Sequence, residues 1–146
     1  TVYNDREGDI DLEADYEGIV WLKRNIKGSP VVLEGVTPTY RWGGRVSIHT
    51  GLPSIVGWRW HQEQQRWDYN TAVGRRISDV ARIYETLDIN VALEILDRYS
   101  VEYVYVGQVE RLYYHGDGLD KFEQSAELER VFHSGRVDIY RVLNGR

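Results

Sequence analysis

Residues 90–107 read NVALEILDRYSVEYVYVG, and this stretch decides the fold. Apolar side chains recur at helical spacing through residues 90–99, which predicts an amphipathic helix. Residues 101–106 are rich in β-branched and aromatic side chains, as is typical of a buried strand that ends here at Gly107. A helix that leads into such a strand is half of a βαβ unit. We therefore expect a sheet with parallel strands and residues 101–106 at its centre.

The same order of helix, turn and short apolar strand occurs earlier in the chain. Residues 15–27 are predicted to form a helix that Asp15 caps, and residues 31–34 a strand that ends before Gly35. Residues 54–56 are predicted to be another short strand, and residues 46–50 could be a helical turn or a strand. These three predicted strands, including 101–106, are expected to be parallel.

The remaining elements complete the prediction. A helix is expected to start at Ser78 or Asp79, and short helices are expected near residues 109–114 and 119–123. Ser134-Gly135 separates two alternating runs, 128–133 and 136–142, which predicts a β-hairpin. The sum is an α/β fold, a three-layer sandwich with a short, mostly parallel sheet, helices on both faces and the antiparallel hairpin at one edge.

Residues 1–14 are acidic and weakly patterned, so they are predicted to be a linker or edge segment before a single α/β domain over residues 15–146. The chain has a net charge of −5, which argues against nucleic-acid binding, and it has no Cys. No apolar run reaches the length of about 18 residues that a membrane span needs. Because the chain starts at Thr1 and contains no Met, we expect it to be part of a longer protein.

Polar and aromatic residues follow each predicted parallel strand. Parallel strands place their carboxyl ends at one edge of a sheet, where ligands bind in open α/β folds. Carboxylates, guanidinium groups and flat aromatic rings suit a sugar or phosphosugar, through ring stacking and bidentate hydrogen bonds. The predicted ligand-binding residues are Glu34, Tyr40, Arg41, Arg45, Trp58, Trp60, His61, Gln62, Arg66, Glu110 and Arg111. The alternative is structural: the Trp rings cover the sheet ends, and the Arg and Glu side chains pair with one another.

Catalytic and metal motifs are weak. The sequence RWGGR at residues 41–45 could cradle an anion, but it lacks the Lys-Ser/Thr of a P-loop and is also typical of a turn. The four His residues lack metal-ligand spacing, and Ser47, His49 and Asp79 lack the nucleophile elbow of a hydrolase triad. We therefore predict no catalytic residue, no metal and no cofactor in this chain.

Two sets of short motifs resemble the YYY-domain family of large multi-spanning membrane proteins from bacteria and archaea. The first set occupies residues 32–34, 37–47, 50–53, 57–58, 61–62 and 65–66 (VLE, TPTYRWGGRVS, TGLP, GW, HQ and QR). The second set, which resembles the carboxyl-terminal end of the same family, includes Asp79-Val80, Ile83-Tyr84, residues 99–107 (YSVEYVYVG), Glu110-Arg111, Tyr114 and Lys121-Phe122. Together they extend over nearly the whole chain.

The family is similar to membrane glycosyltransferases that use lipid-linked sugars. The resemblance implies that this chain is the soluble carboxyl-terminal domain, tethered to its own transmembrane domain on the extracytoplasmic face. It also implies that the catalytic carboxylates belong to the membrane part, so this chain alone is expected to be inactive. Two hypotheses follow: an accessory domain that helps to bind a sugar or lipid-linked sugar, or a structural module that docks on the membrane part or on a partner chain.

Overall fold

The structure is a computed structural model that describes residues 2–5, 8–36, 44–56, 72–114 and 116–143. Its main sheet has four strands in the order β3 (Val31–Leu33), β4 (Val101–Val106), β6 (Val137–Val142) and β5 (Leu128–Ser134). β3 and β4 are parallel, whereas β6 is antiparallel to both of its neighbours. β1 (Val2–Asp5) and β2 (Gly8–Asp11) form a separate antiparallel pair ahead of the first helix.

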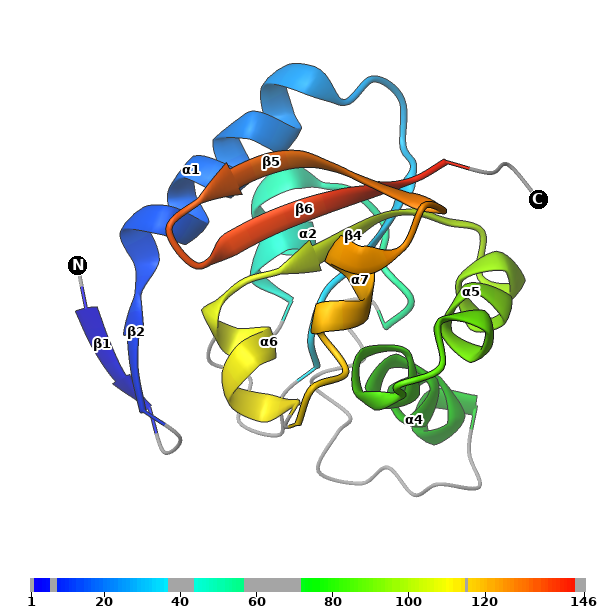
Figure 1. The fold of residues 1–146 in the computed structure, drawn as a ribbon. Helices are drawn as coiled ribbons and strands as arrows, with labels where there is room; N and C mark the ends of the chain where they lie inside the picture. The colour runs from blue at the N-terminus through cyan, green and yellow to red at the C-terminus, as the bar shows by residue number, and fades with distance from the viewer. Residues whose placement is uncertain (1, 6–7, 37–43, 57–71, 115, 144–146) are drawn as a thin grey trace.

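Helices cover both faces of the main sheet (Figure 1). On one face, α1 (Leu12–Asn25) and α2 (Arg45–Thr50) enclose a core that includes Leu22, Val32 and Tyr105. On the other, α4 (Ala72–Glu85), α5 (Ile89–Arg98) and α7 (Asp120–Gln124) enclose a core with Tyr84 and Val104. Successive residues of β4 thus supply opposite cores, as the period of two in a strand requires. α6 (Gln108–Tyr113) follows β4 directly.

The α/β prediction and its central element are confirmed. The predicted helix of residues 90–99 is α5, which Asp88 caps by accepting a hydrogen bond from the backbone N–H of Asn90 at 2.9 Å. The predicted central strand is β4, which lies inside the sheet between β3 and β6. The carboxyl-terminal hairpin is β5–β6, and β5 is an edge strand. Residues 46–50, which the sequence left open, are helical in α2.

The predicted third parallel strand at residues 54–56 is wrong. The backbone N–H of Val32 donates to the carbonyl of Pro53 at 2.9 Å, and the Ser54 hydroxyl donates to the carbonyl of Val56 at 2.7 Å. These bonds hold the segment in an irregular path, although Ile55 and Val56 are both buried in the core. The apolar run was therefore a correct sign of burial and a misleading sign of strand structure.

Two predicted helix caps are also wrong. α1 begins at Leu12, so Asp15 lies within its first turn, where it is 2% exposed. α4 begins at Ala72, so Ser78 and Asp79 lie inside the helix, and the Asp79 carboxylate accepts a hydrogen bond from Tyr99. Both Asp residues are used by tertiary partners rather than by a helix end. Among the described residues, no helix combines the length and hydropathy of a membrane span.

Candidate functional site

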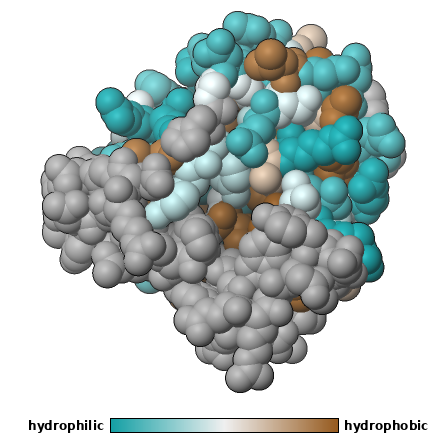
Figure 2. All heavy atoms as spheres, turned by 90° about the horizontal axis from the view of Figure 1, so that it is seen from below, coloured by the Kyte–Doolittle hydropathy of each residue, from teal (hydrophilic) through white to brown (hydrophobic). Residues whose placement is uncertain are grey.

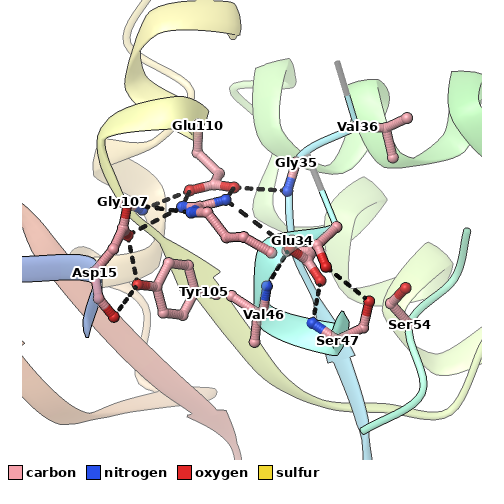
Figure 3. Close-up of polar contacts among 12 residues, drawn as sticks. Asp15, Glu34, Gly35, Val36, Val46, Ser47, Ser54, Tyr105, Gly107 and Glu110 are labelled. Atoms are coloured by element: carbon pink, nitrogen blue, oxygen red, sulfur yellow. Dashed lines mark hydrogen bonds and ion pairs between the residues drawn. The ribbon is translucent and has the colours of Figure 1, made fainter. Parts of the chain in front are cut away.

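A buried ionic cluster lies where the ends of β3 and β4 meet α1, α2 and α6, and Figure 3 shows its carboxylates Asp15, Glu34 and Glu110. Arg45 contacts all three of them. The Arg45 guanidinium donates to Asp15 from Nε at 3.1 Å and from Nη2 at 3.2 Å. It also donates to Glu110 from Nη1 at 3.2 Å and from Nη2 at 2.9 Å. Glu34 is the third carboxylate, 3.9 Å from Nη1. All four side chains are at most 5% exposed, so their charges are stabilised by one another rather than by water.

Each member of the cluster comes from the end of a different element. Asp15 is in the first turn of α1, Glu34 follows β3, Arg45 begins α2, and Glu110 is in the first turn of α6 after β4. β3 and β4 are parallel, so their carboxyl ends lie at the same edge of the sheet and bring Glu34 and Glu110 together. The ion pairs tie these four element ends to one another.

Glu34 supplies the amino-terminal cap that α2 lacks in its own sequence. Gly44 precedes α2 with a φ angle of 81°, a left-handed conformation that favours glycine, and it has no side chain with which to cap the helix. The Glu34 carboxylate accepts instead from the backbone N–H groups of Val46 at 3.0 Å and Ser47 at 2.8 Å. Burial raises the pKa of Glu34 to about 7, although Arg45 and the two N–H groups oppose that increase.

Glu110 joins the ends of both parallel strands. Its Oε1 atom accepts from the backbone N–H of Gly107 at 2.7 Å, and its Oε2 atom accepts from the backbone N–H of Gly35 at 2.7 Å. Gly107 must be small, because a Cβ atom there would lie 2.8 Å from Arg45 Nη2 and 2.9 Å from Asp15 Oδ1. The glycines that end the two strands therefore allow the carboxylates and Arg45 to approach the backbone closely.

Burial alone would lower the pKa of Arg45, but the negative charges of Glu110 and Asp15 raise it well above its usual value. Arg45 is thus a permanent cation. Tyr105 lies against it, with the guanidinium carbon 5.0 Å from the ring centroid. Burial raises the pKa of Tyr105, so its hydroxyl stays protonated and donates to Asp15 Oδ1 at 2.6 Å. The arrangement is a fixed electrostatic framework in which every named carboxylate has a partner.

The structure brings together three of the predicted site residues: Glu34, Arg45 and Glu110. Arg111 is not with them, because it points to β6 and pairs with Asp138 at 2.9 Å. Contact of these four residues with a ligand stays a prediction. The other seven predicted residues lie outside the described residues: Tyr40, Arg41, Trp58, Trp60, His61, Gln62 and Arg66.

Sequence reasoning missed Asp15 and Tyr105 as members of the cluster. The sequence signal for Tyr105 was its place in a buried strand, since a buried Tyr hydroxyl needs a polar partner. No local pattern identifies that partner, because Asp15 is 90 positions away in the chain. Among the described residues, no group of three or more His, Asp or Glu side chains is arranged to hold a metal ion.

Replacing Tyr105 with Phe is expected to lower the free energy of unfolding by about 2 kcal/mol, because it removes a buried hydrogen bond to a charged acceptor. Tyr103→Phe is the matched control: Tyr103 packs on the same core from the same strand. It is expected to change stability by less than about 0.5 kcal/mol. Urea unfolding of both variants measures the difference, and equal losses would contradict a special role for the Tyr105 hydroxyl.

Comparison with solved structures finds proteins of similar fold. The fold is similar to that of the C-terminal globular domain of an oligosaccharyltransferase (AfAglB-S2) from Archaeoglobus fulgidus, with a TM-score of 0.60. The similarity covers 91% of this chain and 99% of that domain, at 12% sequence identity, which establishes a shared fold. No protein-family model and no curated protein matches the sequence. Membership of the YYY-domain family therefore stays a prediction.

Proposed function

We propose that this chain is an accessory domain of a membrane glycosylation protein, where it helps to bind a sugar or lipid-linked sugar and does not catalyse the transfer itself. The observation that carries the proposal is the fold, which is shared over nearly its whole length with a domain of an oligosaccharyltransferase. The sequence resemblance to a glycosyltransferase-like membrane family supports the same class. In this proposal the domain is tethered to its own transmembrane part on the extracytoplasmic face.

The ionic cluster has a defined place in this proposal, because it fixes both flanks of residues 37–43, which belong to the predicted ligand-binding stretch. On one side, Gly35 is bonded to Glu110, and the backbone N–H of Val36 donates to the Tyr114 hydroxyl at 2.9 Å. On the other side, Arg45 is held by Asp15 and Glu110. Glu34, Arg45 and Glu110 thus act as positioning residues for the ligand-binding stretch.

The ligand contacts are assigned to the aromatic and basic residues of this stretch and the one that follows it. Trp58 and Trp60 would stack on sugar rings, and Arg41 and Arg66 would bind phosphate. This division agrees with the burial of the cluster, whose side chains are at most 5% exposed and already paired. In this proposal the chain therefore binds the ligand, and the membrane part catalyses the transfer reaction.

Titration of the chain with a hexose 1-phosphate and with a short-chain polyprenyl-phosphate sugar tests this function. Binding is expected to shift the tryptophan fluorescence and the indole N–H resonances of Trp58 and Trp60, and Trp58→Ala with Trp60→Ala is expected to weaken it at least about tenfold. Trp21→Phe is the control, because Trp21 is on α1 and packs against Phe132 of β5. Absence of any shift at millimolar ligand would rule out direct sugar binding.

The second candidate is a docking module, which the density of Trp and Arg in residues 37–66 also suits. It predicts that the Trp58→Ala and Trp60→Ala changes disturb assembly with the membrane part and that no sugar ligand binds the chain. Co-purification of the variant chain with its membrane part, set against the sugar titration, separates the two functions.

A further inference from the structure

The outer face of α1 carries a stripe of residues beside the ionic cluster. Tyr16, Val20, Lys23 and Lys27 follow one another at intervals of four, three and four residues, which places them on one side of the helix. Tyr16 is 68% exposed although its ring is large and apolar. The opposite side of the helix packs Ile19 and Leu22 into the core. We call the four residues the α1 stripe.

A shallow apolar groove lies on each side of the α1 stripe. The groove toward α2 has a volume of about 280 Å³. It is lined by Ile19, His49 and stripe residues, and also by Asp15 and Arg45 of the ionic cluster. The groove toward β5 has a volume of about 390 Å³, and its walls include Trp21 and Phe132. Tyr16 and Val20 line both grooves, so the two are parts of one continuous surface.

The carboxyl-terminal end of this surface is cationic. Lys23 and Arg24 are in the last turn of α1, and Lys27 follows it; all three are exposed. Within the part of the chain that the structure describes, none of the three forms an ion pair. The acidic residue in the groove toward β5, Glu17, accepts a hydrogen bond from Ser134. Three cations without an ion pair therefore lie together at this end of α1, although the chain has a net charge of −5.

Another face of the molecule differs from this one (Figure 2). There the described residues are mostly hydrophilic, and the hydrophobic side chains between them form small separate groups.

We propose that the α1 face rests on an anionic lipid bilayer, with Tyr16, Val20 and Trp21 at the headgroup level and Lys23, Arg24 and Lys27 bound to lipid phosphates. Tyr and Trp favour the membrane–water interface because their rings are amphipathic. Clustered Lys and Arg next to an apolar face are attracted to anionic headgroups. Because Lys23, Arg24 and Lys27 are positively charged, they favour an anionic bilayer over a neutral surface. Their long side chains extend past the apolar residues to the lipid phosphates.

This proposal deepens the proposed function, because it orients a membrane-tethered accessory domain with α1 against the lipid. It rests on that function for its biological setting, but the binding itself needs only this chain. Lipid binding and sugar binding also use different residues. A variant that loses vesicle binding is expected to retain the sugar titration, so the failure of either proposal is distinguishable from the failure of the other.

Co-sedimentation with lipid vesicles tests the proposal. The chain is expected to bind phosphatidylcholine vesicles that contain about 30% phosphatidylglycerol, to bind pure phosphatidylcholine at least about tenfold more weakly, and to lose affinity as salt is raised. The triple variant K23Q/R24Q/K27Q is expected to lose at least about tenfold in affinity for the anionic vesicles. Tyr16→Ser is expected to weaken binding further, since it removes an apolar ring from the interface.

The matched control is R75Q/R82Q/R98Q, which changes the net charge by the same amount at exposed positions on α4 and α5. It is expected to bind the anionic vesicles as the wild type does, and circular dichroism confirms that both triple variants are folded. Equal loss in the two triple variants would overturn the proposal, because binding would then depend on overall charge. Failure of the wild type to bind anionic vesicles would also overturn it, as would self-association that Tyr16→Ser abolishes, which would assign the face to a second copy of the chain.

Discussion

Replacing Arg45 with Met is expected to lower the free energy of unfolding by about 3–5 kcal/mol, the cost of removing one partner from a buried ion pair. Asp15, Glu34 and Glu110 all face the Arg45 guanidinium, and each is at most 4% exposed. Without the cation, the buried carboxylates of Asp15 and Glu110 would lose their counter-charge in a region that water does not reach. A loss of this size is a large fraction of the roughly 5–15 kcal/mol by which folded domains are stable, so a clear fall in the urea midpoint is expected.

Arg111→Met is the matched control, since Arg111 also pairs with an acidic partner, Asp138, but its side chain is 34% exposed. Its loss is expected to cost less than about 1 kcal/mol. Arg45→Lys keeps the charge and loses the planar fork that serves Asp15 and Glu110 together, so an intermediate loss is expected. Urea unfolding followed by circular dichroism measures all three. Equal losses for Arg45→Met and Arg111→Met would show that burial of the cluster does not govern its energy.

The meeting of Glu34 with Glu110 was predictable from the sequence, because both follow apolar strands that were correctly predicted to be parallel. Their convergence depends on topology alone: parallel strands end at the same edge. Arg45 was predicted to lie at the same edge of the sheet, because it belongs to the segment that follows the predicted strand 31–34. The sequence did not decide whether these residues contact a ligand or pair with one another. In the structure Arg45 pairs with both Glu34 and Glu110.

The errors share a physical cause. Asp15 and Asp79 are suitable helix caps by local rules, but Arg45 and Tyr99 bind them from distant parts of the chain. Residues 54–56 are apolar enough for a strand, yet a hydrogen bond from Val32 to Pro53 fixes their path. Spacing within a few residues reports which side chains are buried. The partner of a buried polar group depends on contacts that local spacing does not contain.

The likeness to the oligosaccharyltransferase domain extends this argument. A fold shared at 12% identity shows that this fold tolerates wide changes in sequence. The cluster is a different kind of feature, because a buried guanidinium needs carboxylates at fixed positions. We therefore expect the cluster to be less tolerant of substitution than the apolar residues around it.

The stability of the domain is expected to fall as the pH rises from about 4.5 to about 7, because Glu34 keeps a proton in the folded state over that range. Burial raises the pKa of Glu34 from 4.5 to about 7, so the folded chain holds a proton that the unfolded chain has released. The contribution of this proton to the free energy of unfolding is complete below pH 4.5 and is lost as the pH rises through 7. Over this interval the loss corresponds to about 3 kcal/mol.

Urea unfolding of the wild type and Glu34→Gln between pH 5 and pH 8 isolates this contribution. At low pH the Glu34→Gln variant is expected to be less stable than the wild type. The two oxygens of Glu34 accept hydrogen bonds from the backbone N–H groups of Val46 and Ser47, whereas the Gln side chain would place its own N–H donors against one of these groups. The deficit of the variant is expected to shrink as the pH rises toward 7 and then to stay constant. Glu129→Gln on β5, whose side chain is 51% exposed, is expected to show no such trend. A Glu34→Gln deficit that is constant from pH 5 to pH 8 would mean that Glu34 is ionised throughout, because Arg45 and the two N–H donors outweigh the cost of burial.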